Sequence, residues 1–229
     1  MLGSFLELSV WTRDIAASVA FYEALGLEHA RVGETWPHRY GVLTDGRLFL
    51  GLHEYEFDSP SVTFVRPGIA EAVARLADAG VEPAFAKTGA DEFHEAGFAD
   101  PAGQMVTLLE ARTFSPPWRE APPRSCCGYF AEYRYPAADP VAVTSFWERL
   151  GPVVDRDADP PRIVAGGITL APRQGLAAPE LVFHAPDPVA VREDLQLRGF
   201  SPTPGAGGAL RLRSPEGLDL RIEPAPDDG

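Results

Sequence analysis

The chain has few cysteines, no long apolar run and a shortage of basic residues, and each shortage excludes a class of protein. Its 229 residues include two cysteines, the adjacent Cys126 and Cys127. Adjacent cysteines rarely bridge each other, and two of them form neither a disulfide scaffold nor a zinc knuckle. We therefore expect ordinary reduced thiols at the start of a strand.

The absence of a long apolar run and the shortage of basic residues limit the kinds of partner that the protein is expected to bind. No segment approaches the roughly 18–20 apolar residues of a membrane span, and the N-terminus lacks the pattern of a signal peptide. A cytoplasmic protein with no membrane partner is expected. The 33 Asp and Glu residues outnumber the 20 Lys and Arg residues, so the formal net charge is −13. Nucleic acid is excluded because phosphate contacts need a basic face. The acidic balance favours solubility and leaves a cationic small molecule open as a ligand.

A repeat organises the chain. The segment 7–27 reads as a strand, a turn and a helix, and a similar segment follows when Asp139 is aligned with Asp14, which places Glu132 on Glu7. A repeat at this distance indicates a duplicated domain. We predict a first domain over residues 1–112, a proline-rich linker over 113–125 and a second domain over 126–225.

Each predicted domain contains two strand–helix–three-strand units. The first strand alternates, so that Leu6 and Leu8 share one face while Glu7, Ser9 and Trp11 share the other. Asp14 is the expected N-cap of the first helix. The later helices are expected at residues 69–78, 140–150 and 188–197.

Three motifs carry a resemblance to a known family. They are Asp14…Ser18…Phe21-Tyr22…Leu25-Gly26-Leu27 after a first strand, Leu76-Ala77-Asp78-Ala79-Gly80-Val81 at the end of a helix, and Asp100-Pro101-Ala102-Gly103-Gln104 before a last strand. With four tandem units, the chain resembles the vicinal oxygen chelate superfamily, which includes glyoxalase I, bleomycin-resistance proteins and extradiol dioxygenases. The resemblance covers nearly the whole chain, and its motifs are specific for a fold rather than for a reaction.

The resemblance implies an α+β fold of two tandem domains, each of two βαβββ units that form curved mixed sheets around a cup. It also implies that metal ligands project from the first and last strands of each unit. A metal enzyme of this kind needs His and carboxylate ligands that converge on one face.

In the first domain, the positions implied by the resemblance hold few such ligands. Glu7 occupies the first strand, with Ser9 and Trp11 on the same face, and His53 ends the last strand of that unit. Ser61 stands where a His is expected, and Thr107 stands where a Glu is expected. These residues are the predicted ligand-binding cup.

The second domain offers Glu132, Glu180 and Arg221 at the matching positions. An arginine at a ligand position opposes a cation, so Arg221 is expected to pair with Glu132 or Glu180. The shared glutamates Glu7 and Glu132 indicate common ancestry or a common role, and both interpretations stay open.

The first functional hypothesis is a metal-free protein that binds a small molecule and resembles the bleomycin-resistance branch. It would sequester an antibiotic or a hydrophobic metabolite, with no catalytic residue and no cofactor. Aromatic side chains would help to line its pocket, namely those of Trp11, Trp36, Tyr40, Tyr55 and Phe57. His29 and His38, in charge-rich segments, are expected to face solvent.

The alternative is a lyase or isomerase resembling glyoxalase I, with Ni, Zn, Fe or Mn held by Glu7 and His53. A third possibility is that the second domain binds nothing and only completes the assembly, as an internal pseudo-dimer partner. The pairing of the four units, and the choice between monomer and homodimer, are left open.

Overall fold

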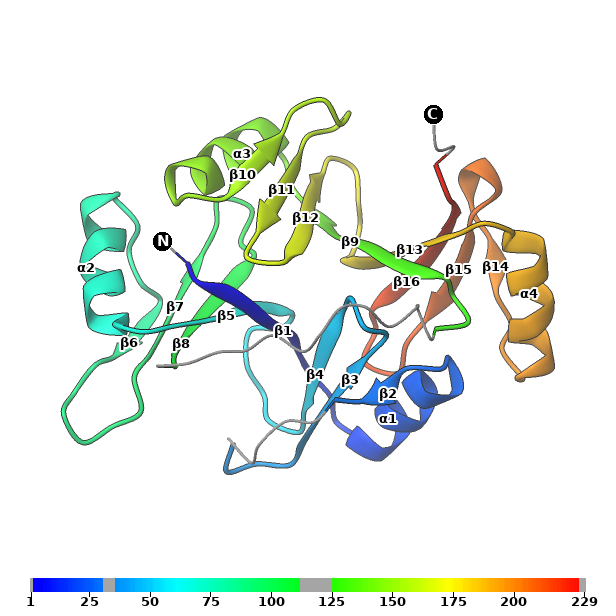
Figure 1. Ribbon diagram of the computed structural model, residues 1–229, viewed down its shortest axis with the longest axis horizontal. Helices are drawn as coiled ribbons and strands as arrows, with labels where there is room; N and C mark the ends of the chain where they lie inside the picture. Colours follow the sequence, from blue (N-terminus) through cyan, green and yellow to red (C-terminus); the bar gives the residue numbers. More distant parts are fainter. Residues whose placement is uncertain (1, 31–35, 112–124, 227–229) are drawn as a thin grey trace. The chain divides into compact units, whose positions relative to one another are not determined.

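The computed structural model describes residues 2–30, 36–111 and 125–226 (Figure 1). The chain is α+β, with four helices and two eight-stranded mixed sheets in this described part. The predicted fold class is confirmed. None of the described helices is long and apolar enough to span a membrane.

The first sheet has the strand order β2-β3-β4-β1-β5-β8-β7-β6. Its first βαβββ unit comprises β1 (Ser4–Trp11), α1 (Ile15–Ala24), β2 (Glu28–His29), β3 (Tyr40–Thr44) and β4 (Phe49–His53). Its second unit comprises β5 (Ser61–Arg66), α2 (Ile69–Asp78), β6 (Phe85–Lys87), β7 (Glu95–Ala99) and β8 (Met105–Glu110).

The second sheet repeats this order as β10-β11-β12-β9-β13-β16-β15-β14. The third unit comprises β9 (Tyr129–Pro136), α3 (Pro140–Arg149), β10 (Val153–Asp155), β11 (Arg162–Ala165) and β12 (Ile168–Arg173). The fourth comprises β13 (Glu180–Ala185), α4 (Pro188–Leu197), β14 (Thr203–Pro204), the 3-10 turn η1 (Ala206–Gly208), β15 (Leu210–Arg213) and β16 (Asp219–Pro224).

Local sequence signals explain where the helices begin. The side chains of Asp14, Asp139 and Asp187 accept hydrogen bonds from first-turn N–H groups of α1, α3 and α4. Helix α2 begins instead at Gly68, which has no side chain to cap it. There the carboxylate of Glu110 accepts from the N–H groups of Gly68 and Ile69, both at 2.8 Å. A strand residue distant in sequence thus replaces the local cap.

The described chain divides into two compact lobes, each assembled from separated segments. Lobe 1 is made of residues 1–9, 58–116 and 135–177, and lobe 2 of residues 10–57, 117–134 and 178–229. Lobe 1 therefore joins most of the second and third βαβββ units, and lobe 2 joins most of the first and fourth. Consecutive units share a sheet, whereas the compact packing pairs units from opposite halves. The predicted domain boundaries stay a prediction, and linker residues 113–124 lie outside the described residues.

In both lobes a turn before the last strand supplies a carboxylate to aromatic partners. In lobe 1, Asp100 accepts from the Tyr135 hydroxyl at 2.8 Å and from the Trp147 indole N–H at 3.0 Å. In lobe 2, Glu216 accepts from Ser18 at 2.9 Å and from the Tyr22 hydroxyl. Burial, followed by the nearby Glu216 charge, raises the pKa of Tyr22 well above its usual value. Such buried polar pairs fix how the units of each lobe pack.

Candidate functional site

Strand register in lobe 1 places one polar and aromatic row along a single face of the first sheet. Glu7 of β1 pairs with Thr63 of β5, Thr63 with Thr107 of β8, Thr107 with Gly97 of β7, and Gly97 with Phe85 of β6. Directly paired residues present their side chains on the same face. The row therefore carries a carboxylate, two hydroxyl groups and an aromatic ring.

Hydroxyl groups connect this row to the neighbouring positions. The Ser9 hydroxyl donates to Glu7 Oε1 at 2.8 Å, and its oxygen lies 2.7 Å from Thr63 Oγ1. The hydroxyls of Ser61 and Thr107 lie 2.8 Å apart. We call Glu7, Ser9, Ser61, Thr63 and Thr107 the hydroxyl face. Four of the five were candidates from the sequence; Thr63 was missed, although its spacing of two from Ser61 is the signal that places it on the same face.

Gly97 lets an aromatic ring lie against the sheet next to the hydroxyl face. A Cβ atom at Gly97 would stand 2.2 Å from Cε1 of the Phe85 ring, so only glycine accommodates that ring where it lies. Phe85 nevertheless stays 37% exposed. One ring surface is therefore held beside a row of hydrogen-bonding groups.

His53 lies in lobe 2 within a cluster of aromatic and imidazole rings. It is buried, stacks on Tyr40 with ring centroids 5.8 Å apart, and has its Nδ1 2.9 Å from His38 Nε2. The expectation that His38 faces solvent is wrong, because ring stacking leaves it half-buried. The half-buried Trp11 carries the Arg13 guanidinium over its ring at 5.3 Å. The predicted aromatics Trp36, Tyr55 and Phe57 each contact His38 or His53.

A different arrangement occupies the matching positions of the second sheet, all within lobe 2. The Nε of Arg134 donates to Glu132 Oε1 at 2.5 Å. Its two terminal nitrogens donate to the two oxygens of Glu223 at 2.7 and 2.8 Å. We call Glu132, Arg134, Glu180, Arg221 and Glu223 the charged face. Glu132, Glu180 and Arg221 were sequence candidates; Arg134 and Glu223 were missed, although both stand two residues from a candidate on the same strand.

The predicted partners of Arg221 are wrong. Arg221 donates from Nε to Glu223 Oε1, because residues two apart on β16 project side by side from the same face. Glu180 is held instead by Arg211 Nη2 at 3.1 Å. Arg211 stands directly opposite Arg221 in the β15–β16 register, which brings it within reach of β13.

The ion pairs of the charged face change the pKa values of its members. Burial opposes the charges of Arg134 and Glu223, but their mutual hydrogen bonds outweigh it. The pKa of Arg134 is raised through its contacts with Glu223 and Glu132. The pKa of Glu223 falls to about 2, because Arg134 and Arg221 both donate to its carboxylate.

A complete set of metal ligands is not formed by the described residues. Among them, no group of three or more His, Cys, Asp or Glu side chains converges so as to hold an ion. The hydroxyl face brings one carboxylate, that of Glu7, and hydroxyl oxygens. On the charged face arginines hold Glu132 and Glu180. The residues present therefore do not fit a metal centre of the kind the resemblance implies.

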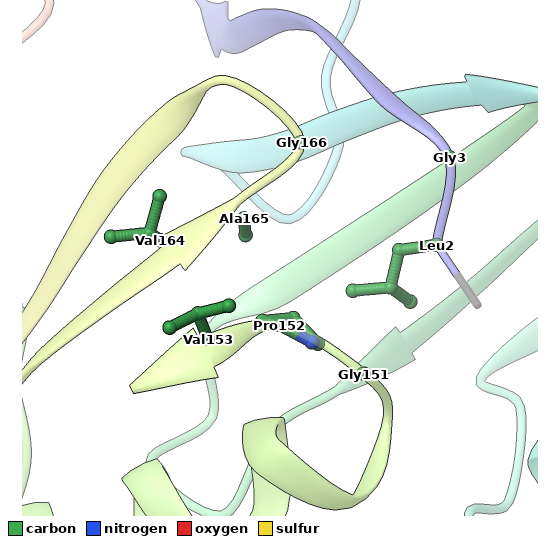
Figure 2. Close-up of a pocket in the computed structure, with 8 residues that line it drawn as sticks. All are labelled: Leu2, Gly3, Gly151, Pro152, Val153, Val164, Ala165 and Gly166. Carbon is green, nitrogen blue, oxygen red and sulfur yellow. The ribbon is translucent and has the colours of Figure 1, made fainter. Parts of the chain in front are cut away.

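A small pocket of about 150 Å³ lies elsewhere in lobe 1 (Figure 2). Its walls are apolar side chains and glycine backbone, from Leu2, Gly3, Gly151, Pro152, Val153, Val164, Ala165 and Gly166. None of the predicted site residues lines it, and it presents no titratable group. The pocket therefore offers no side chain for acid–base or metal chemistry.

Comparisons with known proteins show which solved structures have a similar architecture. No protein-family model and no curated protein matches the chain. Among solved structures, a catechol 2,3-dioxygenase is similar over 99% of this chain and 90% of its own, with 13% identity and a TM-score of 0.60. Homoprotocatechuate 2,3-dioxygenase from Brevibacterium fuscum, in complex with 3,4-dihydroxyphenylacetate, is similar over 99% and 83%, with 14% identity and a TM-score of 0.62. An extradiol ring-cleaving dioxygenase from B. fuscum covers 100% and 75%, with 15% identity and a TM-score of 0.60.

These neighbours correct two expectations from the sequence. The prediction that the protein uses no cofactor is contradicted by the comparison with extradiol dioxygenases, which favours the divalent-metal alternative. The bleomycin-resistance and glyoxalase assignments gain no support from any match. At these identities the likeness establishes the fold alone, and the chain has the fold of the solved extradiol dioxygenases.

Proposed function

We propose that this protein binds a small hydroxylated aromatic molecule on the hydroxyl face, beside the ring of Phe85. The observation that carries the proposal is the row of paired residues Glu7, Thr63, Thr107, Gly97 and Phe85. A sheet interior is ordinarily lined by apolar side chains, and polar groups there need hydrogen-bond partners. Short hydroxyl side chains in succession on β1, β5 and β8 supply both donors and acceptors to a ligand.

The ring beside that row indicates the shape of the ligand. Aromatic rings pack on one another in offset or edge-to-face arrangements that contribute about 0.5–1.5 kcal/mol beyond the area buried. Phe85 keeps part of its surface exposed because Gly97 beneath it has no side chain. A planar ligand could contact this ring while its hydroxyl groups bond to Thr107 and Thr63.

The solved neighbours support the same ligand class. One of them is a complex with 3,4-dihydroxyphenylacetate, which joins ring hydroxyls to a planar ring. The chemistry of the hydroxyl face fits such a molecule independently of that likeness, since it offers a carboxylate to accept ring hydroxyl protons and serine and threonine to donate in return.

Calorimetric titration with dihydroxyphenylacetate and with phenylacetate tests the proposal. The dihydroxylated compound should bind more tightly, and Thr63→Val should weaken its binding about tenfold, the equivalent of one lost hydrogen bond of about 1.4 kcal/mol. Glu180→Gln, at the position of the charged face that matches Ser61, is the control and should leave the affinity unchanged. Equal affinity for both compounds, or an equal effect of both variants, would contradict the proposal.

A divalent-metal enzyme is the second candidate, and the comparison with extradiol dioxygenases favours it. Glu7 is the carboxylate that this alternative assigns to the ion. Elemental analysis of protein purified without chelator, before and after Glu7→Gln, decides the matter. A stoichiometric ion that is lost in the variant establishes the metal site, and an ion content that the variant does not change removes Glu7 from it.

A further inference from the structure

The two cysteines of the chain are the central residues of a turn that leads into β9. Within this turn the Gly128 N–H donates to the Ser125 carbonyl oxygen at 3.3 Å, and the Cys127 N–H donates to the Ser125 hydroxyl at 3.0 Å. The Cys126 N–H donates to the carbonyl oxygen of Leu25, at the C-terminal end of α1, at 2.8 Å. Hydrogen bonds thus hold the backbone of both cysteines in place, and both thiols are free.

The two thiols differ in exposure and in surroundings. Cys126 is half-buried, whereas Cys127 is fully buried. The Arg198 guanidinium lies near Cys126 and donates to Asp194 at 2.9 Å and to the Ala24 carbonyl oxygen at 3.2 Å, all within lobe 2. A hydrogen bond from Cys127, and then the Arg198 charge, lower the pKa of Cys126 although partial burial opposes them. The sulfur that a reagent can reach is therefore the one that more readily becomes a thiolate.

We propose that Cys126 and Cys127 form a reversible redox site, in which a hydroperoxide oxidises Cys126 and Cys127 then closes a disulfide with it. The Cys126 sulfur attacks one peroxide oxygen, so the O–O bond breaks, a sulfenic acid forms, and the other oxygen leaves with the thiol proton as water or an alcohol. The Cys127 sulfur then attacks the sulfenic sulfur. The S–O bond breaks, the S–S bond forms, and the hydroxyl group leaves as water with the Cys127 proton.

The electrons of this sequence balance without a further reactant. The two thiols together lose two electrons and two protons, and the peroxide gains them. Because Cys127 is buried, the neighbouring sulfur is the electrophile within its reach in the folded protein. No residue of the hydroxyl face takes part, so the proposal does not depend on the ligand proposed for that face.

The spacing of the two cysteines makes the bridge easy to open again. Consecutive Cα atoms lie about 3.8 Å apart across a trans peptide bond. Most disulfides join Cα atoms about 4.4–6.8 Å apart, and departures from that range strain the bond and make it easier to reduce. Strained bridges have more oxidising potentials than structural disulfides. We therefore expect a bridge that forms under an oxidant and that a small thiol reverses.

Mass spectrometry of the tryptic peptide 125–134 tests the proposal. This peptide contains both cysteines of the chain and no methionine, so a mass change in it reports on the thiols. Folded, reduced protein is treated with hydrogen peroxide, and the remaining free thiols are alkylated before digestion. We expect the peptide to lose the mass of two hydrogen atoms and to take up no alkyl group, and glutathione added before alkylation should reverse the change.

Three results of this measurement would overturn the proposal. The peptide could stay reduced, it could gain oxygen without forming a bridge, or the bridge could join two chains, which non-reducing electrophoresis detects. Each result would mean that Cys127 does not close a disulfide with Cys126. The measurement uses the wild-type chain, so it stays decisive if a cysteine variant fails to fold.

Two variants assign the roles of the sulfurs. In Cys127→Ala the sulfenic acid of Cys126 has no partner thiol, so it should persist and be trapped by a dione reagent such as dimedone. In Cys126→Ala the remaining thiol is buried, so peroxide should leave the peptide of the folded protein unchanged. Oxidation of Cys126→Ala at the wild-type rate, or no trapped sulfenic acid in Cys127→Ala, would count against the assigned roles and overturn the proposal.

Discussion

The hydroxyl face and the charged face occupy matching positions of the two sheets, and they differ in the partner that each gives to a shared glutamate. Ser9 stands two residues after Glu7, and Arg134 stands two residues after Glu132. Both partners donate to the glutamate that precedes them, at 2.8 and 2.5 Å. The strand geometry is the same at both positions, so the side chain two residues after the glutamate determines whether a hydroxyl group or a guanidinium donates to it.

The remaining matching positions also carry hydroxyl groups in the first sheet and charged groups in the second. Ser61 pairs with Ser9 in the first sheet, as Glu180 pairs with Arg134 in the second. The hydroxyl side chains are short, and their hydrogen bonds join residues of the same strand or of adjacent strands. The arginines are long enough to link strands that do not pair directly. The two copies thus share a fold, whereas one presents small polar groups and the other presents a network of ion pairs.

The largest expected effect is on stability at the charged face. Arg134→Met should lower the free energy of unfolding by about 3–5 kcal/mol, because it removes a nearly buried guanidinium that makes three hydrogen bonds to the carboxylates of Glu132 and Glu223. Ser9→Ala at the matching position should cost about 1 kcal/mol, the net value of an ordinary hydrogen bond. Urea denaturation of both variants measures the contrast. Similar losses in the two variants would remove the distinction between the faces.

The acid sensitivity of the charged face is the next expected effect. The pKa of Glu223 is about 2 in the folded protein, against an ordinary value of 4.5. Because the unfolded chain takes up the proton first as pH falls, the stabilisation is present above pH 4.5 and is lost as pH falls toward 2. The destabilisation caused by Glu223→Gln should therefore shrink by on the order of 3 kcal/mol between pH 6 and pH 2.

Unfolding measured across this pH range, with Ser9→Ala as the comparison, checks the acid effect. Ser9→Ala removes no titratable group, so its cost should change much less with pH. A pH-independent cost for Glu223→Gln would show that its ion pairs do not contribute.

A smaller effect concerns the ring beside the hydroxyl face. Gly97→Ala should cost about 1–3 kcal/mol, since the new methyl group would overlap the Phe85 ring and force it to move. In Gly97→Ala/Phe85→Ala the overlap is gone, so the two changes together should cost less than the sum of the single changes. A double-mutant cycle from urea denaturation measures this. Additive costs would mean that the ring does not lie against Gly97.

The smallest effect concerns thiol reactivity at the start of the second sheet. A hydrogen bond from Cys127, and then the nearby charge of Arg198, lower the pKa of Cys126. The hydrogen bond from Cys126, together with burial, raises the pKa of Cys127. Cys126 should therefore react with a disulfide reagent at lower pH than a free thiol, and Cys127 should react only on unfolding. Rates for Cys126→Ser and Cys127→Ser check the order, and faster reaction of Cys127 would contradict it.

Much of the fold could be predicted from local sequence signals. The helices Ile69–Asp78 and Pro188–Leu197 have the predicted bounds, and Asp14 caps α1 as predicted. The repeat of Glu7 at Glu132 correctly indicated duplication. These signals are readable because helix caps and strand alternation depend on residues close together in the chain.

The candidate site was only partly predictable. Strand alternation placed Glu7 and Ser9 on one face, but β1 has a register shift between Phe5 and Glu7 that alternation alone does not show. The partner of Arg221 was missed because the prediction considered only the glutamates of β9 and β13, whereas Glu223 stands two residues along β16 on the same face. His38 was assigned to solvent because its segment is rich in charge, whereas stacking with Tyr55 determines its burial.

The sequence by itself determined the four βαβββ units, the duplicated glutamate and the class of side chain at each inward position, since these follow from period, cap and turn residues. Only the tertiary structure decided that Arg134 bridges Glu132 and Glu223, that Arg211 holds Glu180, and that Phe85 lies over Gly97. Each of these contacts joins strands far apart in the chain. Their geometry is fixed by strand register and by which long side chain reaches which charge, and neither is encoded in a short window of residues.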